Sequence, residues 1–200
     1  MPVEFWFPTP IYYSQLDGEQ LSNVQEELGL AFDVLKENNS FGQAPGWGSK
    51  THQVSDPRFV DNIIDDFKLI ALKTEIYNHV HSYMQELNSS VNKKFRIAAS
   101  WFTETKPGEY TRVHNHGSSD ISGVYYFKTN KNDGALTFMS PVQLLPAIIF
   151  TKLQDTVTYQ PEVGKLILFP GWMYHTVAEN ETADDRISLS FNIYLSLIHI

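Results

Sequence analysis

Two pairs of histidines, each separated by one residue, are the first candidates for chemistry, and their expected settings differ. His79 and His81 lie in a predicted helix, where side chains two residues apart point to different sides and cannot share a metal ion. His114 and His116 stand in "YTRVHNHGSSDISGVYYF", at the end of an extended run, where residues i and i+2 project from the same face. The second pair could therefore bind one metal ion, or it could lie in a surface turn.

A third histidine is needed to complete a metal site. His175, in "LILFPGWMYHTV", stands in a short extended run 61 residues after His114 (175 minus 114). Strands of two opposed sheets could bring it to the first pair. The chain contains no cysteine, which excludes disulfides, iron–sulfur clusters and thiolate zinc sites and leaves His and carboxylate groups as ligands.

The segment "DDRISLSFNIYL" contains a candidate for binding an anion. Arg186 and Ser188 are two residues apart on a predicted strand and therefore share a face, while the alternate positions are apolar. An inward-facing Arg beside a Ser hydroxyl could hold a carboxylate through a bidentate, charge-assisted hydrogen bond. The alternative is a surface strand in which Arg186 pairs with Asp184 or Asp185.

These residues together resemble a known superfamily. Residues 114–192 are similar to the iron(II)- and 2-oxoglutarate-dependent oxygenases, in which a His-x-Asp/Glu motif precedes a distant His and an Arg-x-Ser/Thr motif. The core of that superfamily is a double-stranded β-helix, a form of the jelly roll. The segments "FPTPIYY", "HNHGSSDISGVYYF", "LILFPGWMYH" and "RISLSFN" resemble a prolyl-hydroxylase-like subgroup whose substrates are unassigned.

The resemblance implies a metal site with one departure from the usual pattern. His116 occupies the position of the metal-binding carboxylate, so the implied ligands of Fe(II) are three imidazoles, from His114, His116 and His175. Asp120 is the alternative third ligand, if the "GSSD" segment brings it to the metal and leaves His116 to bind substrate. The three-His set is favoured because its i, i+2 geometry reproduces that of the usual pair.

The resemblance also implies the reaction and the binding of the co-substrate. The cofactors would be Fe(II), 2-oxoglutarate and O2, and a substrate would be hydroxylated with release of succinate and CO2. Arg186 would bind the distal carboxylate of 2-oxoglutarate, assisted by Ser188 and by the hydroxyl of Tyr125 or Tyr126. The substrate, a protein side chain or a small molecule, is not indicated.

Aromatic residues are the candidates for the substrate pocket. Trp47 and Trp172 are flanked by glycines in predicted loops, where they could meet a substrate. Trp101, Phe138 and Phe169 could line the pocket or belong to the ordinary core. Two rival functions remain: a cupin-like metal enzyme that does not use 2-oxoglutarate, which would have no need for Arg186 and Ser188, and a non-enzymatic jelly-roll binding module.

The elements that must position these residues can be read from periodicity. We expect an extended segment over 7–16, a helix over 21–39 with Asp17 as its N-cap, and a loop over 38–50. A second helix over 55–87, either continuous or broken in two, should begin at Ser55 or Asp56. Short β-branched and aromatic runs follow from residue 95, and Asp133-Gly134 is the predicted tip of a hairpin.

The expected architecture is therefore a mainly β, jelly-roll fold buttressed by N-terminal helices (α+β). We expect residues 1–200 to form a single domain, in which 1–94 supply the extended segment and supporting helices and 95–200 form the jelly-roll core.

Composition restricts the partners and the compartment. The net charge is −8, from 15 Lys and Arg against 23 Asp and Glu, so nucleic acid is not an expected partner. No run of about 18 apolar residues is present, so no membrane span is expected. Because the first residues also lack the pattern of a signal peptide, the expected location is cytoplasmic.

Overall fold

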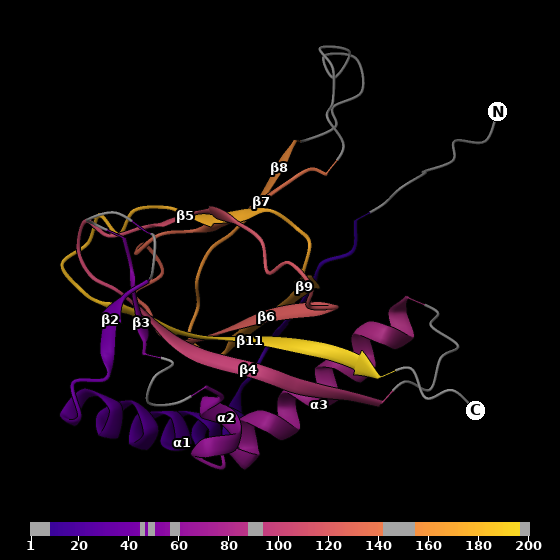
Figure 1. The fold of residues 1–200 in the computed structure, drawn as a ribbon, viewed down its shortest axis with the longest axis horizontal. Helices are drawn as coiled ribbons and strands as arrows, with labels where there is room; N and C mark the ends of the chain where they lie inside the picture. Colours follow the sequence, from indigo (N-terminus) through magenta and orange to yellow (C-terminus); the bar gives the residue numbers. More distant parts are fainter. Residues whose placement is uncertain are drawn as a thin grey trace.

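Two antiparallel β-sheets face each other, and helices cover the outer side of the larger sheet (Figure 1). The computed structural model describes residues 9–44, 47, 51–56, 61–87, 94–141 and 155–196. In order across the larger sheet lie β1 (Tyr12–Gln15), β9 (Lys165–Pro170), β6 (Ile121–Lys128), β11 (Arg186–Ser196), β4 (Lys94–Thr105), β3 (Gln53–Ser55) and β2 (Phe41–Gln43). The smaller sheet has the order β5 (Thr111–His114), β10 (His175–Val177), β7 (Leu136–Met139) and β8 (Thr156–Tyr159). The predicted jelly-roll architecture with supporting helices is confirmed.

The helices α1 (Gly18–Glu37), α2 (Ile63–Asp66) and α3 (Ile70–Glu86) pack beneath the larger sheet (Figure 1). Asp17 is the N-cap of α1, as predicted, although its side chain makes no capping hydrogen bond. The first turn of α3 is capped from α1 instead, because the Glu27 carboxylate accepts hydrogen bonds from the backbone N–H groups of Ala71 and Leu72. A carboxylate at a helix N-terminus accepts hydrogen bonds from the free N–H groups of the first turn, and its negative charge interacts favourably with the helix dipole.

The second predicted helix begins later than the sequence suggested and is broken in two. The break between α2 and α3 falls at Lys68, whose φ of 54° is incompatible with a continuous helix. Ser55 is not a cap but the last residue of β3, where its hydroxyl accepts a hydrogen bond from the backbone N–H of Phe102. Pro57, expected near the first helical position, lies outside the described residues.

Alternation along β11 separates the helix-facing core from the space between the sheets. Ile187, Leu189 and Phe191 are buried in the cluster that joins the sheet to α1 and α3. Arg186 and Ser188 face the opposite side and line a pocket. Each large apolar side chain buried in this way contributes about 1.5–3 kcal/mol. The helices therefore stabilise the sheet that forms the pocket's floor.

Two predicted loops have a different structure from the one expected. Residues 41–43, in the predicted loop over 38–50, form β2, which pairs with β3 and extends the larger sheet. Asp133-Gly134 is not a hairpin tip, because β6 and β7, on either side of it, belong to different sheets. The connection from β6 to β7 is stabilised by the buried Asp133 carboxylate, which accepts hydrogen bonds from the Thr129 hydroxyl and the Asn130 N–H.

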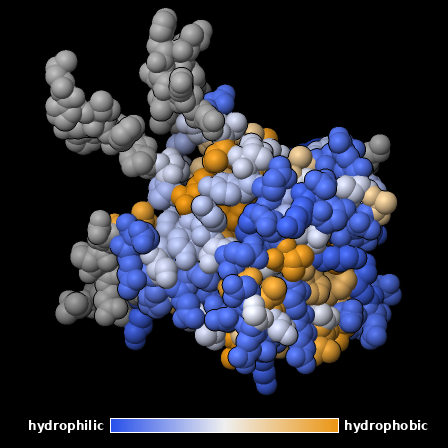
Figure 2. Space-filling model, turned by 180° about the vertical axis from the view of Figure 1, so that it is seen from behind, coloured by the Kyte–Doolittle hydropathy of each residue, from blue (hydrophilic) through white to orange (hydrophobic). Residues whose placement is uncertain are grey.

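The surface is predominantly hydrophilic on the face seen from behind in Figure 2, where apolar residues form separate groups among polar ones. Among the described residues, no helix combines the length and the apolar character that crossing a membrane requires.

Candidate metal and co-substrate site

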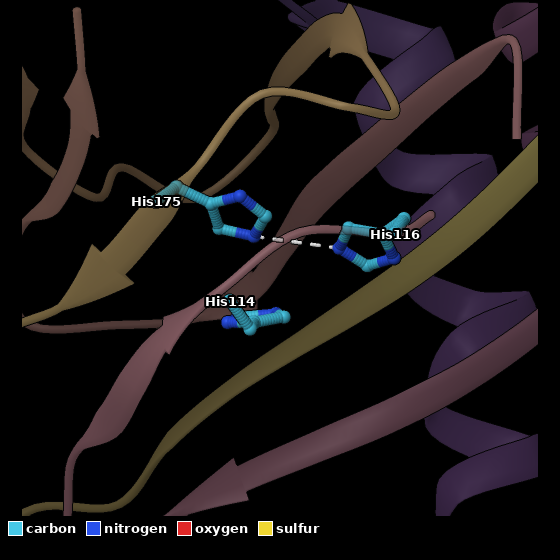
Figure 3. Close-up of side chains that lie close together, drawn as sticks. All are labelled: His114, His116 and His175. Carbon is cyan, nitrogen blue, oxygen red and sulfur yellow. Dashed lines mark hydrogen bonds between the residues drawn. The ribbon is translucent and has the colours of Figure 1, made fainter. Parts of the chain in front are cut away.

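Three histidines converge between the two sheets (Figure 3). His114 ends β5 and His175 begins β10, and the two are directly paired in the ladder. His116 follows two residues after His114, and its Nε2 atom lies 3.3 Å from Nε2 of His175. One ligand atom from each of the three rings lies within 4.8 Å of the others. The structure thus brings together the three histidines that the sequence singled out.

The orientation of two of the three rings is set by backbone carbonyls. Nδ1 of His114 lies 2.9 Å from the carbonyl oxygen of Arg112, and Nδ1 of His175 lies 3.0 Å from that of Met173. A carbonyl can only accept a hydrogen bond, so each Nδ1 carries the proton and each Nε2 presents a lone pair. This second contact of a ligating histidine is the usual arrangement in metal sites. The converging lone pairs fit a cation.

The histidines also have the charge state that a metal ligand requires. Burial, together with the charge of neighbouring histidines, lowers the pKa of His116 to about 4 and the pKa of His175 to about 3. Burial also lowers the pKa of His114. All three rings are therefore neutral at pH 7, and a cation does not have to displace protons from them.

Asp120, the alternative ligand, does not join this cluster. It is exposed, and its carboxylate accepts a hydrogen bond of 2.7 Å from the backbone N–H of Leu195. The group of potential ligands among the described residues consists of the three histidines. We therefore keep His116 in the proposed ligand set.

Arg186 also lines this pocket and is buried, with 2% of its surface exposed. Its Nη1 donates to the carbonyl oxygens of Asp133 and Gly134, at 2.6 and 2.8 Å, and its Nη2 donates to the Thr105 hydroxyl at 2.9 Å. These bonds use three of the five N–H donors of a guanidinium group. Arg186 is therefore held rigidly, and its other two donors have no hydrogen-bond partner among the described residues. Its side chain is not in a surface ion pair with Asp184 or Asp185.

Strand alternation decides between the two candidate tyrosines. Tyr126 is paired with Ser188 on β11 and lines the pocket beside it, and burial raises the pKa of Tyr126 to about 12. Its hydroxyl is therefore a neutral donor at physiological pH. Tyr125 points to the opposite side, into the core between the sheet and the helices. We therefore drop Tyr125 from the proposed co-substrate site.

Aromatic rings surround the histidines. Trp101 lines the pocket and stacks on His116, with ring centroids 5.7 Å apart. Trp47 meets His114 edge-on at 5.1 Å. Trp172 is 49% exposed and does not line the described pocket. Phe169 lines the pocket, and Phe138 is fully buried behind it in the same apolar cluster.

A fourth histidine, His52, lines the same pocket and was missed by the sequence analysis. It is 5% exposed, and its Nδ1 lies 3.1 Å from the Thr111 hydroxyl. Burial, the main cause, and the charges of His114 and Arg186 lower the pKa of His52 to about 4. A lone histidine in a Gly- and Pro-rich stretch has no local pattern; only its nearness to Trp47 hinted at a shared site.

An irregularity in the smaller sheet brings Thr111 to that position. Between β5 and β10 the register shifts, so that His175 pairs with His114 while Val177 pairs with Thr111. Four residues of β5, 111–114, thus match three residues of β10, 175–177. The extra residue of such a bulge changes which side chains share a face, and both Thr111 and His114 line the pocket.

Comparison with known proteins is consistent with this geometry. A family model described as "Putative 2OG-Fe(II) oxygenase" matches residues 99–192. No curated protein sequence matches the chain.

Similar solved structures share the fold. They include the non-heme alpha-ketoglutarate-dependent epimerase SnoN from nogalamycin biosynthesis (16% identity, 92% of this chain and 77% of that chain covered, TM-score 0.64). HygX from Streptomyces hygroscopicus, with nickel and 2-oxoglutarate bound, is 11% identical (94% and 84% covered, TM-score 0.59). A prolyl hydroxylase from Trichoplax adhaerens, in complex with a hypoxia inducible factor peptide fragment, is 14% identical (92% and 83% covered, TM-score 0.62).

Proposed function

We propose that the chain is a 2OG-Fe(II) oxygenase, which its match to that family over residues 99–192 supports, and that it uses Fe(II), 2-oxoglutarate and O2 to hydroxylate a C–H bond of its substrate, with release of succinate and CO2. The substrate would be a protein side chain or a small molecule. The observation that carries the proposal is the convergence of three imidazole nitrogens within 4.8 Å, facing a pocket that ends at a buried arginine.

His114, His116 and His175 would hold the iron. When bound, Fe(II) with 2-oxoglutarate would activate O2, which supplies the oxidising power to break a C–H bond. The chain's contribution at this end is to present three neutral nitrogen ligands, of which those of His114 and His175 are already oriented by the carbonyls of Arg112 and Met173. Little rearrangement is then needed when the metal binds.

Arg186, Ser188 and Tyr126 would bind the distal carboxylate of 2-oxoglutarate. Arg186 brings the positive charge, while the hydroxyls of Ser188 and Tyr126, which line the pocket beside it, add neutral donors. The guanidinium is buried before the co-substrate arrives and has no carboxylate partner within ion-pair distance among the described residues. A bound dicarboxylate would offset that buried charge.

The buried arginine also favours this proposal over a cupin-like enzyme that does not use 2-oxoglutarate. Such an enzyme needs the histidines but has no use for a fixed guanidinium with free donors. A purely structural jelly-roll module would need neither feature.

The decisive test is anaerobic titration of the metal-free protein with Fe(II) and then with 2-oxoglutarate, followed by visible absorbance. We expect the charge-transfer band of an iron-chelated 2-oxo acid in the wild type. His175→Ala should abolish the band, whereas His81→Ala, at an exposed histidine on α3, should not change it.

The second arm of this test concerns the carboxylate end. Arg186→Ala should still bind Fe(II) but should need at least 100-fold more 2-oxoglutarate to develop the band, since a buried ion pair is lost. Arg96→Ala, at an arginine outside the pocket, is the matched control. Tight Fe(II) binding without any band in the wild type would favour the cupin-like alternative.

A further inference from the structure

His52 occupies a position that the proposed function has not yet used. It lies outside residues 99–192, the part of the chain that matches the family model. It nevertheless lines the same pocket as the three histidines and Arg186. Its backbone is fixed by a hydrogen bond of 3.0 Å from its own N–H to the carbonyl oxygen of Tyr110. Trp47 packs edge-on against its ring, with centroids 4.8 Å apart.

The sheet register aligns His52 with Arg186. Arg186 on β11 is paired with Thr105 on β4. On the other side of β4, Gln53 is paired with Glu104 and Val54 with Thr103. One further step of this antiparallel register places His52 opposite Thr105. Directly opposite residues point to the same face of a sheet, so the three side chains form one row across neighbouring strands, with backbones about 5 Å apart at each step.

The hydrogen bonds of His52 leave one ring nitrogen for a ligand. Nδ1 is 3.1 Å from the Thr111 hydroxyl and 3.4 Å from the Tyr110 carbonyl oxygen, which is at the limit of a hydrogen bond. The Tyr110 carbonyl can only accept, whereas the Thr111 hydroxyl can also donate to Nδ1; an anion beside the ring selects the tautomer in which Thr111 donates and the proton lies on Nε2. No described residue forms a hydrogen bond with this Nε2.

The group that Nε2 would meet is an anion. Among the described residues that line the pocket there is no carboxylate, and Arg186 is the one side chain with a permanent charge. Arg186 has two N–H donors left, whereas a carboxylate has about four lone-pair sites to satisfy. A further neutral donor in the same row would complete its binding without repelling the guanidinium.

We propose, building on the proposed function, that His52 is a positioning residue for 2-oxoglutarate, whose Nε2–H donates to the same distal carboxylate that Arg186 binds. The loop and strand before residue 94 then supply part of the co-substrate site, in addition to supporting the fold.

The test is the apparent Kd for 2-oxoglutarate, measured anaerobically from the visible band of the Fe(II)-loaded protein. His52→Leu should raise this Kd about 10- to 100-fold, the effect of one hydrogen bond to a charged group. His52→Gln keeps an amide donor near the position of Nε2 and should recover much of the lost affinity. This variant also tests the proposal if His52→Leu does not fold. His79→Gln, at a histidine on α3, should leave the Kd unchanged.

A second acid identifies the end of the co-substrate that His52 contacts. 2-Oxobutyrate keeps the 2-oxo acid but lacks the distal carboxylate, so its Kd should be the same in the wild type and in His52→Leu. Equal weakening of both acids, or an unchanged Kd for 2-oxoglutarate, would overturn the proposal. Absence of the band in the wild type would instead overturn the proposed function itself, so the two failures are distinguishable.

Discussion

At the scale of single residues, the site depends on which atom of each side chain carries a proton. The Nδ1 atoms of His114 and His175 face carbonyl oxygens, so their Nε2 lone pairs point into the pocket. His52 differs, because its Nδ1 also lies at a hydroxyl that can donate to it, and in that tautomer Nε2 carries the proton, as the proposed contact with a carboxylate requires. The same residue type can therefore serve as a metal ligand or as an anion donor, depending on its partner.

The low pKa values of the buried histidines predict an acid sensitivity of the metal-free protein. The pKa of His175 is lowered to about 3 by burial first and by neighbouring histidines second, against about 6.5 in the unfolded chain. Below pH 6.5 the unfolded state therefore binds more protons than the folded state. The free energy of unfolding should fall as the pH falls from about 6.5 toward 3, by up to about 1.4 kcal/mol per pH unit for this group.

The measurement is chemical denaturation of the metal-free protein at several pH values between about 7 and 5, a range in which carboxylates contribute little to the pH dependence. His175→Gln should flatten the slope, because it removes the titrating group. Identical slopes for the wild type and the variant would contradict the prediction.

At the scale of elements, the turn between β6 and β7 holds the arginine in place. Gly134 has a φ of +106° and its carbonyl oxygen accepts a hydrogen bond from Arg186. A Cβ at this position would collide with the carbonyl oxygen of Ala178 and would lie 2.6 Å from Nη1 of Arg186. The glycine is therefore required both by the backbone conformation and by the close approach of the guanidinium.

Gly134→Ala should displace Arg186 while leaving the histidines in place. We expect Fe(II) binding to be retained and the Kd for 2-oxoglutarate to rise on the order of 10-fold, a loss of about 1.4 kcal/mol. Gly108→Ala is the matched control, since Gly108 also has a positive φ, of 79°, but the nearest atom to its added Cβ is 3.9 Å away. Equal effects of the two substitutions on the Kd would show that strain alone is responsible.

The site residues that could be predicted from the sequence are those whose spacing matches the two-residue period of a strand. Arg186 and Ser188 share the pocket face, as their two-residue spacing predicted. The choice between Tyr125 and Tyr126 required knowing which face of β6 is the pocket, and two adjacent tyrosines give no sign of it. His52 required the pairing of β3 with β4, a contact between segments about 50 residues apart that local patterns do not encode.

The hairpin predicted at Asp133-Gly134 fails for a related reason. Asp-Gly favours a tight turn wherever it occurs, but the turn residues do not specify whether the next strand returns to the same sheet. Here β7 joins the smaller sheet, and the carbonyl groups of the turn bind Arg186. A tertiary contact thus determines the path of the chain.

At the scale of the whole molecule, the pocket and the helices share one sheet. The cluster that contains Leu28 of α1 also contains Phe102 and Leu189, on the two strands that form the pocket's floor. Loss of packing between the helices and the sheet should therefore also disturb the pocket on the other face of the sheet. We therefore predict that residues 1–200 unfold as a single domain.

Leu28→Ala should destabilise the fold by about 2–5 kcal/mol, because it leaves a cavity at a fully buried position. Leu30→Ala, on the same helix but 67% exposed, should change stability by less than about 0.5 kcal/mol. Unfolding should be followed by both far-ultraviolet circular dichroism and tryptophan fluorescence. Separate midpoints for the two signals would indicate that the helical and β portions are independent domains.

The continuous strand β11 has a consequence for how this enzyme can change over evolution. Arg186 lies at its start, and Ser190, four residues on, is paired with Trp101, the residue that stacks on His116. Sliding the strand by one residue would turn every one of its side chains to the other face. In the proposed site, the distance between Arg186 and the metal could therefore change only in two-residue steps of β11, each of which disturbs both neighbouring strands. The register of one strand would thus restrict the length of the co-substrate.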